Sequence, residues 1–182
     1  MKRRGTILTL LFFLLLSGFG SPDLINESDI YTELRTAMVE KQILARGVSD
    51  IRILEAMGTV PRHLFVSEVY IQQSYADHPL PIGYGQTISQ PYIVAFMTEI
   101  LSVESGDRIL EIGTGSGYQA AVLSMLTDHV YTIEIIDELA SEAENRLAEL
   151  GFDSIEISAG LKKLPSTRLL SQPRPVMFRR TS

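Results

Sequence analysis

Arg108-Ile-Leu-Glu-Ile-Gly-Thr-Gly-Ser-Gly117 is the stretch that decides the fold of this chain. It opens with a short apolar run, residues 108–112, and continues into a turn with glycine at positions 113, 115 and 117. A short apolar run bounded by glycines is typical of a buried parallel strand. Glycines after such a strand let the backbone approach a ligand closely, and the next helix presents unpaired N–H groups there. We therefore expect a strand, a ligand-binding turn and a helix.

Strands and helices alternate downstream of this turn. We predict helices over residues 118–126 and 137–150, and strands over residues 129–134 and 154–158. Because parallel strands need long crossover connections, this alternation predicts an α/β fold with a doubly wound, mostly parallel sheet of the Rossmann-like kind.

The segment upstream of the sheet is mainly helical. The expected elements are helices over residues 30–45 and after Ser49, helical turns over 67–75, a loop or short hairpin over 80–89, and a helix from Gln90-Pro91. Asp29 or Thr32 is the expected cap of the first helix, and Ser49 that of the second.

The spacing of the glycines separates two classes of ligand. The dinucleotide fingerprint is Gly-x-Gly-x-x-Gly, whereas this turn reads Gly-x-Gly-x-Gly, with Tyr118 and Gln119 where the third glycine would fall. Glu134 ends the next strand, about 20 positions on, where an acidic residue accepts hydrogen bonds from ribose hydroxyls. The pattern predicts an adenosine-containing ligand without pyrophosphate. Glu111 is either a ligand contact or a strand carboxylate that satisfies local N–H groups.

Composition limits the classes of protein to which the chain belongs. It has 182 residues, enough for one domain, a formal net charge of -6 and no cysteine. An acidic chain is a poor partner for a phosphate backbone, so we expect no nucleic-acid partner. The expected oligomeric state, which the composition does not determine, is a monomer. Without cysteine there is no disulfide and no thiolate metal site. His63, His78 and His129 are scattered, which predicts packing or surface roles and no metal centre.

The first 21 residues differ from the rest of the chain. Basic residues at positions 2–4 precede an apolar run over residues 7–16, broken only by Thr9. Small residues around one phenylalanine follow at 18–21. This is the layout of a secretory signal peptide, and the run is shorter than the roughly 20 residues of a membrane-spanning helix. It predicts a periplasmic or secreted protein with no stable membrane span. The open alternatives are an uncleaved anchor and a cytoplasmic protein whose true start lies downstream, for instance at Met38.

Two long motifs give the chain a specific resemblance. Leu80-Pro-Ile-Gly-Tyr-Gly-Gln-Thr-Ile-Ser-Gln-Pro91 and Ile109-Leu-Glu-Ile-Gly-Thr-Gly-Ser-Gly-Tyr-Gln-Ala-Ala-Val-Leu123 resemble the protein-L-isoaspartate O-methyltransferases, and they occur in the family's order. Val60-Pro-Arg62 is similar to the same family. The resemblance covers residues 34–158 and implies a class I Rossmann-like methyltransferase domain, incomplete at its C-terminus, over residues 29–158.

The resemblance implies a reaction and a set of site residues. The implied reaction transfers a methyl group from S-adenosylmethionine to the carboxylate of L-isoaspartyl residues in damaged proteins, which allows repair through a cyclic succinimide. Ser89 matches the family's active-site serine and is expected to hold the substrate carboxylate, with Thr87 nearby. The residues expected at the cofactor are Gln86, Thr87, Ile88, Ser89, Glu111, Gly113, Thr114, Gly115, Gly117 and Glu134.

The implied chemistry needs few specialised side chains. A substrate carboxylate with a pKa near ~4 is ionised at neutral pH, so it is already the nucleophile and needs no general base. The protein mainly aligns oxygen, methyl group and sulfur, which contributes up to roughly 7–11 kcal/mol in well-oriented systems. A simpler explanation of Ser89 and Thr87 stays open, in which they cap the helix that begins at Gln90-Pro91.

Residues 159–182 depart from the family pattern. The segment has six basic residues, no acidic one and no helical or strand period, so it is predicted to be disordered and translated out of frame. Without the family's next strand, residues 109–112 would form an exposed apolar edge that aggregates. The alternatives to an active enzyme are an inactive truncated fragment and a methyltransferase of another substrate class. A genuine basic tail is the alternative for the segment itself.

Overall fold

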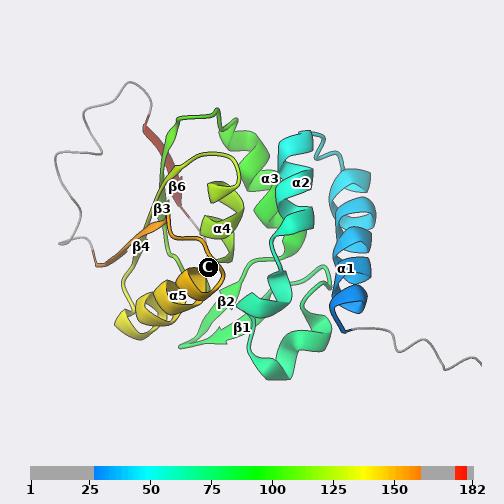
Figure 1. Ribbon diagram of the computed structural model, residues 1–182, viewed down its shortest axis with the longest axis horizontal. Helices are drawn as coiled ribbons and strands as arrows, with labels where there is room; N and C mark the ends of the chain where they lie inside the picture. The colour runs from blue at the N-terminus through cyan, green and yellow to red at the C-terminus, as the bar shows by residue number, and fades with distance from the viewer. Residues whose placement is uncertain (1–26, 161–174, 180–182) are drawn as a thin grey trace, which may run out of the picture.

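The computed structural model describes residues 27–160 and 175–179. This part of the chain forms a four-stranded sheet, a layer of helices and a separate two-stranded hairpin (Figure 1). The predicted leader, residues 1–21, lies outside the described residues. Within them, no helix has the length and apolar character needed to cross a membrane.

The apolar run before the glycine turn forms an internal strand of the sheet. The strands and helices of this region are β3 (Arg108–Ile112), α4 (Tyr118–Ser124), β4 (His129–Glu134), α5 (Asp137–Glu149) and β5 (Glu156–Ala159). β3 pairs in parallel with β4, and β4 pairs in parallel with β5. Ile109 lies beside Val130 in the register of the central pair. The predicted parallel sheet with crossover helices is confirmed.

The structure corrects part of the prediction for the basic segment over residues 159–182, of which residues 159, 160 and 175–179 are described. β6 (Pro175–Arg179) pairs in parallel with β3, and the order of the sheet is β5-β4-β3-β6. The prediction of an exposed edge at residues 109–112 is therefore wrong. Ladder hydrogen bonds use backbone groups, so a short apolar stretch, residues 176–178, is enough to complete the pair. The out-of-frame origin of the segment stays a prediction.

The helices lie on one side of the sheet in Figure 1, with α4 near the strands and α1 farthest from them. The bounds of the outer helices are α1 (Glu27–Met38), α2 (Ile51–Thr59) and α3 (Pro91–Leu101). A small core joins α4 to the sheet through Ile109, Ala120, Leu123 and Val130. A larger core extends outward through the helices and the hairpin, and its members include Met57, Phe65, Ile88, Tyr118 and Leu147.

The first predicted helix is interrupted in the structure. Where the spacing predicts one helix over residues 30–45, α1 passes into a π-helical turn η1 (Val39–Ile43) and a 3-10 turn η2 (Leu44–Arg46). Because α1 begins at Glu27, neither Asp29 nor Thr32 is its cap. Helical spacing of apolar residues does not distinguish these turns from a regular α-helix, since all of them bury one face.

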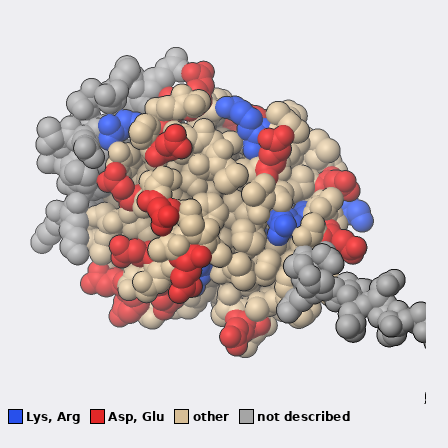
Figure 2. Space-filling model, viewed as in Figure 1, with Lys and Arg blue, Asp and Glu red and all other residues tan. Residues whose placement is uncertain are grey.

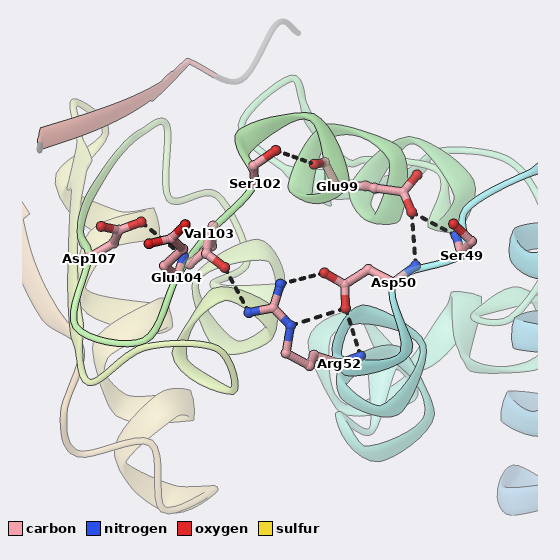
Figure 3. A network of polar contacts seen from close by, with 8 residues as sticks. All are labelled: Ser49, Asp50, Arg52, Glu99, Ser102, Val103, Glu104 and Asp107. Atoms are coloured by element: carbon pink, nitrogen blue, oxygen red, sulfur yellow. Dashed lines mark hydrogen bonds and ion pairs between the residues drawn. The ribbon is translucent and has the colours of Figure 1, made fainter.

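The cap of α2 is one residue later than predicted, and it belongs to the polar network in Figure 3. The Asp50 carboxylate accepts a hydrogen bond of 2.9 Å from the backbone N–H of Arg52. The predicted cap, Ser49, instead donates its backbone N–H to Glu99 Oε1 at 2.7 Å. Arg52 also donates to the carbonyl of Val103 at 2.9 Å, so the network joins the start of α2 to the end of α3.

A hairpin carries the second motif. Two 3-10 turns, η3 (Arg62–Phe65) and η4 (Glu68–Gln73), precede the antiparallel strands β1 (Leu80–Gly83) and β2 (Gln86–Ile88). Tyr84 and Gly85 form the tip with φ angles of 51° and 70°. Left-handed values at both central residues match a tight hairpin turn. The predicted short hairpin is confirmed, and it ends directly before Ser89.

The negative charge of the chain is unevenly distributed. Figure 2 shows acidic side chains gathered over α5, at the lower left of the view. The sequence of this helix contains Asp137, Glu138, Glu142, Glu144 and Glu149. A phosphate backbone would be repelled by such a face.

Candidate active site

The glycine turn between β3 and α4 has the geometry that the sequence predicts. Gly113, Gly115 and Gly117 have φ angles of 94°, 55° and 87°, a region that residues with a Cβ rarely adopt. The turn is anchored to β4, because the backbone N–H groups of Gly113 and Thr114 donate to the carbonyl of Ile133 at 2.7 and 3.2 Å. The turn is therefore held against the carboxyl end of the neighbouring strand.

Glu134 lies at that strand end and is 5% exposed. Its Oε2 accepts a hydrogen bond of 2.8 Å from the backbone N–H of Gly115. Its Oε1 accepts from the backbone N–H groups of Ile135 and Ile136 at 2.9 and 3.1 Å. A carboxylate has about four acceptor positions, so the three bonds fix its orientation and still leave capacity for a ligand hydroxyl.

Glu111 is fully buried beneath the turn. Its Oε2 accepts a hydrogen bond of 2.7 Å from the Thr132 hydroxyl, which lies 2.7 Å from the hydroxyl of Thr114. This partner of Glu111 is a threonine side chain of the neighbouring strand β4. These linked hydrogen bonds connect β3, β4 and the glycine turn. Glu111 therefore helps to hold the turn in place through Thr132 and Thr114.

The hairpin segment predicted to face the substrate differs in exposure along its length. Ile88 is buried, Thr87 is exposed, and Gln86 and Ser89 are half-buried. Gln90 is the N-cap residue of α3, and it makes no capping hydrogen bond through its side chain. The structure therefore does not support the explanation that Ser89 and Thr87 serve only as caps of this helix.

Arg62 brings the two predicted motifs together. Its Nη2 donates to the carbonyl of Ser89 at 2.8 Å, and its Cζ lies 4.9 Å from the centre of the Tyr118 ring. Tyr118 is the first residue of α4, directly after Gly117. Burial raises the pKa of Tyr118 to about 12, so its phenol stays neutral at physiological pH. The Ser89 segment therefore lies next to the glycine turn.

Sequence reasoning missed two further contributors to the site. Arg146 of α5 donates to the carbonyl of Ser116, within the glycine turn, at 2.9 Å, and burial lowers the pKa of this guanidinium. Ile135 directly follows Glu134, and 79% of its surface is exposed. The sequence offered one signal for Ile135, which is its position directly after the acidic residue that ends the strand. No local pattern indicated Arg146.

Histidines and acidic residues form no metal centre in the described part of the chain. His63 packs face to face with Tyr31 at 4.0 Å between ring centres, and its Nδ1 lies 2.7 Å from the Tyr75 hydroxyl. His78 and His129 are exposed. The predicted packing and surface roles of these residues are confirmed.

The fold and the site together define a class of protein. A parallel sheet carries a glycine turn after β3 and an acidic residue, Glu134, at the end of β4. Helices cover one side of this sheet (Figure 1). This is the Rossmann-like architecture of the class I methyltransferases, in which an adenosine-containing ligand binds at the carboxyl ends of the strands.

The comparisons with known proteins identify the family. The sequence model of Protein-L-isoaspartate(D-aspartate) O-methyltransferase (PCMT) matches residues 33–163, and the chain belongs to this family. The protein-L-isoaspartate O-methyltransferase of Synechococcus sp. (strain JA-2-3B'a(2-13)) is 55% identical over 133 residues, which are 73% of this chain and 54% of the relative. Protein-L-isoaspartate O-methyltransferase 2 of Shewanella sediminis (strain HAW-EB3) is 52% identical over 134 residues, which are 74% of this chain and 55% of the relative.

A solved structure agrees with this assignment. A protein-L-isoaspartate O-methyltransferase superposes with a TM-score of 0.67 at 28% identity, covering 81% of this chain and 47% of the other. The resemblance predicted from the two motifs is confirmed. The chain spans about half the length of the curated relatives it matches.

Proposed function

We propose that this protein transfers a methyl group from S-adenosylmethionine to the carboxylate of L-isoaspartyl residues in damaged proteins. Family membership supports the reaction, and the position of Ser89 beside the glycine turn supports the site. The proposal depends most on one observation. The guanidinium of Arg62 contacts both the Ser89 carbonyl and the ring of Tyr118, the first residue after the glycine turn.

The described residues fit the cofactor. The turn offers backbone N–H groups and three glycines in left-handed conformations, which allow a ligand close to the main chain. The Glu134 carboxylate suits a ribose hydroxyl, and the exposed Ile135 beside it suits a flat, apolar base. When bound, S-adenosylmethionine supplies an electrophilic methyl group and its own leaving group.

The chain's own residues then bind and orient the substrate. A carboxylate substrate with a pKa near ~4 is ionised at neutral pH, so no side chain has to remove a proton from it. We assign the Ser89 hydroxyl to donate a hydrogen bond to one carboxylate oxygen, with Thr87 at the exposed rim. This bond fixes the other oxygen for in-line attack, and alignment is the main contribution of such a site.

Two measurements on the full chain test the proposal. Calorimetric titration with S-adenosylmethionine should give saturable binding, and a radiolabelled methyl group should appear on an isoaspartyl peptide. A peptide of the same sequence with normal aspartate is the matched control and should stay unlabelled. Equal labelling of both peptides would indicate a methyltransferase of another substrate class. Absence of transfer to the isoaspartyl peptide would overturn the proposal, and absence of cofactor binding as well would indicate an inactive fragment.

We also propose that residues 1–21 direct export, so that the mature protein is periplasmic or secreted. The basic start, the short apolar run and the small residues after it support this proposal. Expression with the native N-terminus, cell fractionation and intact-mass measurement test it. A shortened chain in the exported fraction is expected, whereas a full-length chain confined to the cytoplasm would support the alternative location.

A further inference from the structure

Arg62 has the largest side chain among the fully buried residues of the described part of the chain. It opens the 3-10 turn η3, directly after Pro61, and none of its surface is exposed. Removing a guanidinium from water is unfavourable unless hydrogen bonds replace its hydration. A core position therefore tolerates arginine only where its donors meet well-placed acceptors.

The acceptors are carbonyl groups of two separate segments. Arg62 Nε donates to the carbonyl of Ser74 at 2.7 Å, and Nη2 donates to the carbonyl of Ser89 at 2.8 Å. Ser74 directly follows η4, and Ser89 directly follows β2. Because the guanidinium is planar and rigid, its N–H directions fix the two carbonyls relative to each other.

The face of the same guanidinium contacts a third segment. Its Cζ lies 4.9 Å from the centre of the Tyr118 ring, and Tyr118 is itself 1% exposed. A cation over an aromatic face is attracted to it, and the attraction is larger away from water. Arg62 therefore connects the backbone of Ser89 with the residue that follows the glycine turn.

We propose that Arg62 is a positioning residue that sets the separation between the Ser89 segment and the glycine turn. This inference rests on the proposed function, because that separation aligns the substrate carboxylate with the methyl group. Arg62 is fully buried beneath the site, so we assign it an effect through Ser89 and Tyr118 and no contact with the reacting atoms. Errors of about 1 Å in such alignment cost on the order of a hundredfold in rate.

Phe65 offers a matched control in the same turn. It is 1% exposed, and its ring lies 5.4 Å from that of Tyr118 in an edge-on arrangement. Phe65→Leu therefore loosens the same core without removing a donor to Ser89. Arg62→Lys keeps the charge but replaces the planar fork by a single ammonium group.

Hydrogen exchange tests the positioning role independently of activity. Amides of residues 86–90 in Arg62→Lys should exchange roughly tenfold faster than in Phe65→Leu, after correction for the global stability of each variant in urea. Equal corrected exchange in the two variants would overturn the proposal. Tyr118→Leu keeps both donors and removes the ring, so it should raise exchange in the same segment even if Arg62→Lys does not fold.

Kinetics on the same variants adds a second test. Arg62→Lys should lower kcat for the isoaspartyl peptide by about tenfold or more, with KM and the Kd for S-adenosylmethionine within about twofold of the wild-type values. A loss confined to cofactor affinity would overturn the positioning role. A wild-type chain that transfers no methyl group would overturn the proposed function, and the exchange measurements would still decide the role of Arg62.

Discussion

Ser89 is the residue on which the proposed chemistry depends most directly. Ser89→Ala should lower kcat/KM for an isoaspartyl peptide by about 10–100-fold, because a hydrogen bond to a charged group contributes roughly 1.5–3 kcal/mol. The Kd for S-adenosylmethionine should stay the same. Ser67→Ala is the matched control, since Ser67 precedes η4 and makes no capping hydrogen bond through its side chain. Unchanged turnover of Ser89→Ala would remove Ser89 from the mechanism.

Gly117 allows the glycine turn to adopt a backbone conformation that would destabilise the protein with any other residue at this position. Its φ is 87°, and an added Cβ would lie 3.1 Å from Leu147 Cδ1 of α5. Gly117→Ala should lower the free energy of unfolding by about 1–2 kcal/mol, the cost of a left-handed conformation. Urea unfolding monitored by circular dichroism measures this change.

Gly58 provides the control for that substitution. It lies within α2, and an added Cβ would meet only Val39 Cγ2, at 4.0 Å. Gly58→Ala should therefore be neutral or should stabilise the protein by about 0.5–1 kcal/mol, because alanine favours the helix. Equal destabilisation by Gly117→Ala and Gly58→Ala would show that the left-handed backbone conformation of Gly117 is not the reason for its effect on stability.

At the scale of elements, Asp50 determines where α2 begins. A hydrogen bond from the Arg52 side chain holds the pKa of Asp50 below its usual value of 3.8. Because the folded pKa is the lower one, the stabilisation is complete above about pH 5 and is lost as the pH falls through 3.8 towards the folded value. Acid should therefore weaken the contact between α2 and α3 that Figure 3 shows.

Asp50→Ala tests this pH dependence. The variant should lose about 0.5–2 kcal/mol of stability at pH 7, as expected for an N-cap. The loss should be smaller at pH 3, because that pH lies below the usual carboxyl pKa of 3.8 and part of the charge-dependent stabilisation is then gone. Urea unfolding at the two pH values measures the difference. Arg52→Gln should retain the cap and show a smaller acid effect. An equal loss at both pH values would show that the charge of Asp50 does not stabilise α2.

Elements with a strong local pattern were predictable. The bounds of β3 and β4 agree with the predicted strands, because apolar runs between turn residues have few alternatives. The start of α3 at Pro91 follows from the fixed φ of proline. The break of α1 into η1 was not predictable, since it depends on packing against α2 and α3 rather than on spacing.

At the scale of the whole molecule, β6 decides whether β3 is internal or at an edge. A chain that ends at Gly160 should aggregate faster than one that ends at Arg179, because the backbone groups of β3 would lose their partner. Light scattering at equal concentration measures the difference. Equal aggregation of the two chains would contradict a protective role for this strand pair.

The sequence by itself determined the class of fold and the glycine turn, because these depend on residues that are neighbours in the chain. It left a loop or a short hairpin open over residues 80–89, and the structure decided for the hairpin. It also indicated the ligand class and the family, through motifs that are continuous. Only the tertiary structure decided that Arg62 bonds to Ser89, 27 residues away, and that Thr132 supports Glu111, 21 residues away. The same holds for β6 beside β3. Such contacts join segments that are far apart in the sequence and come together only on folding, so no local sequence pattern predicts them.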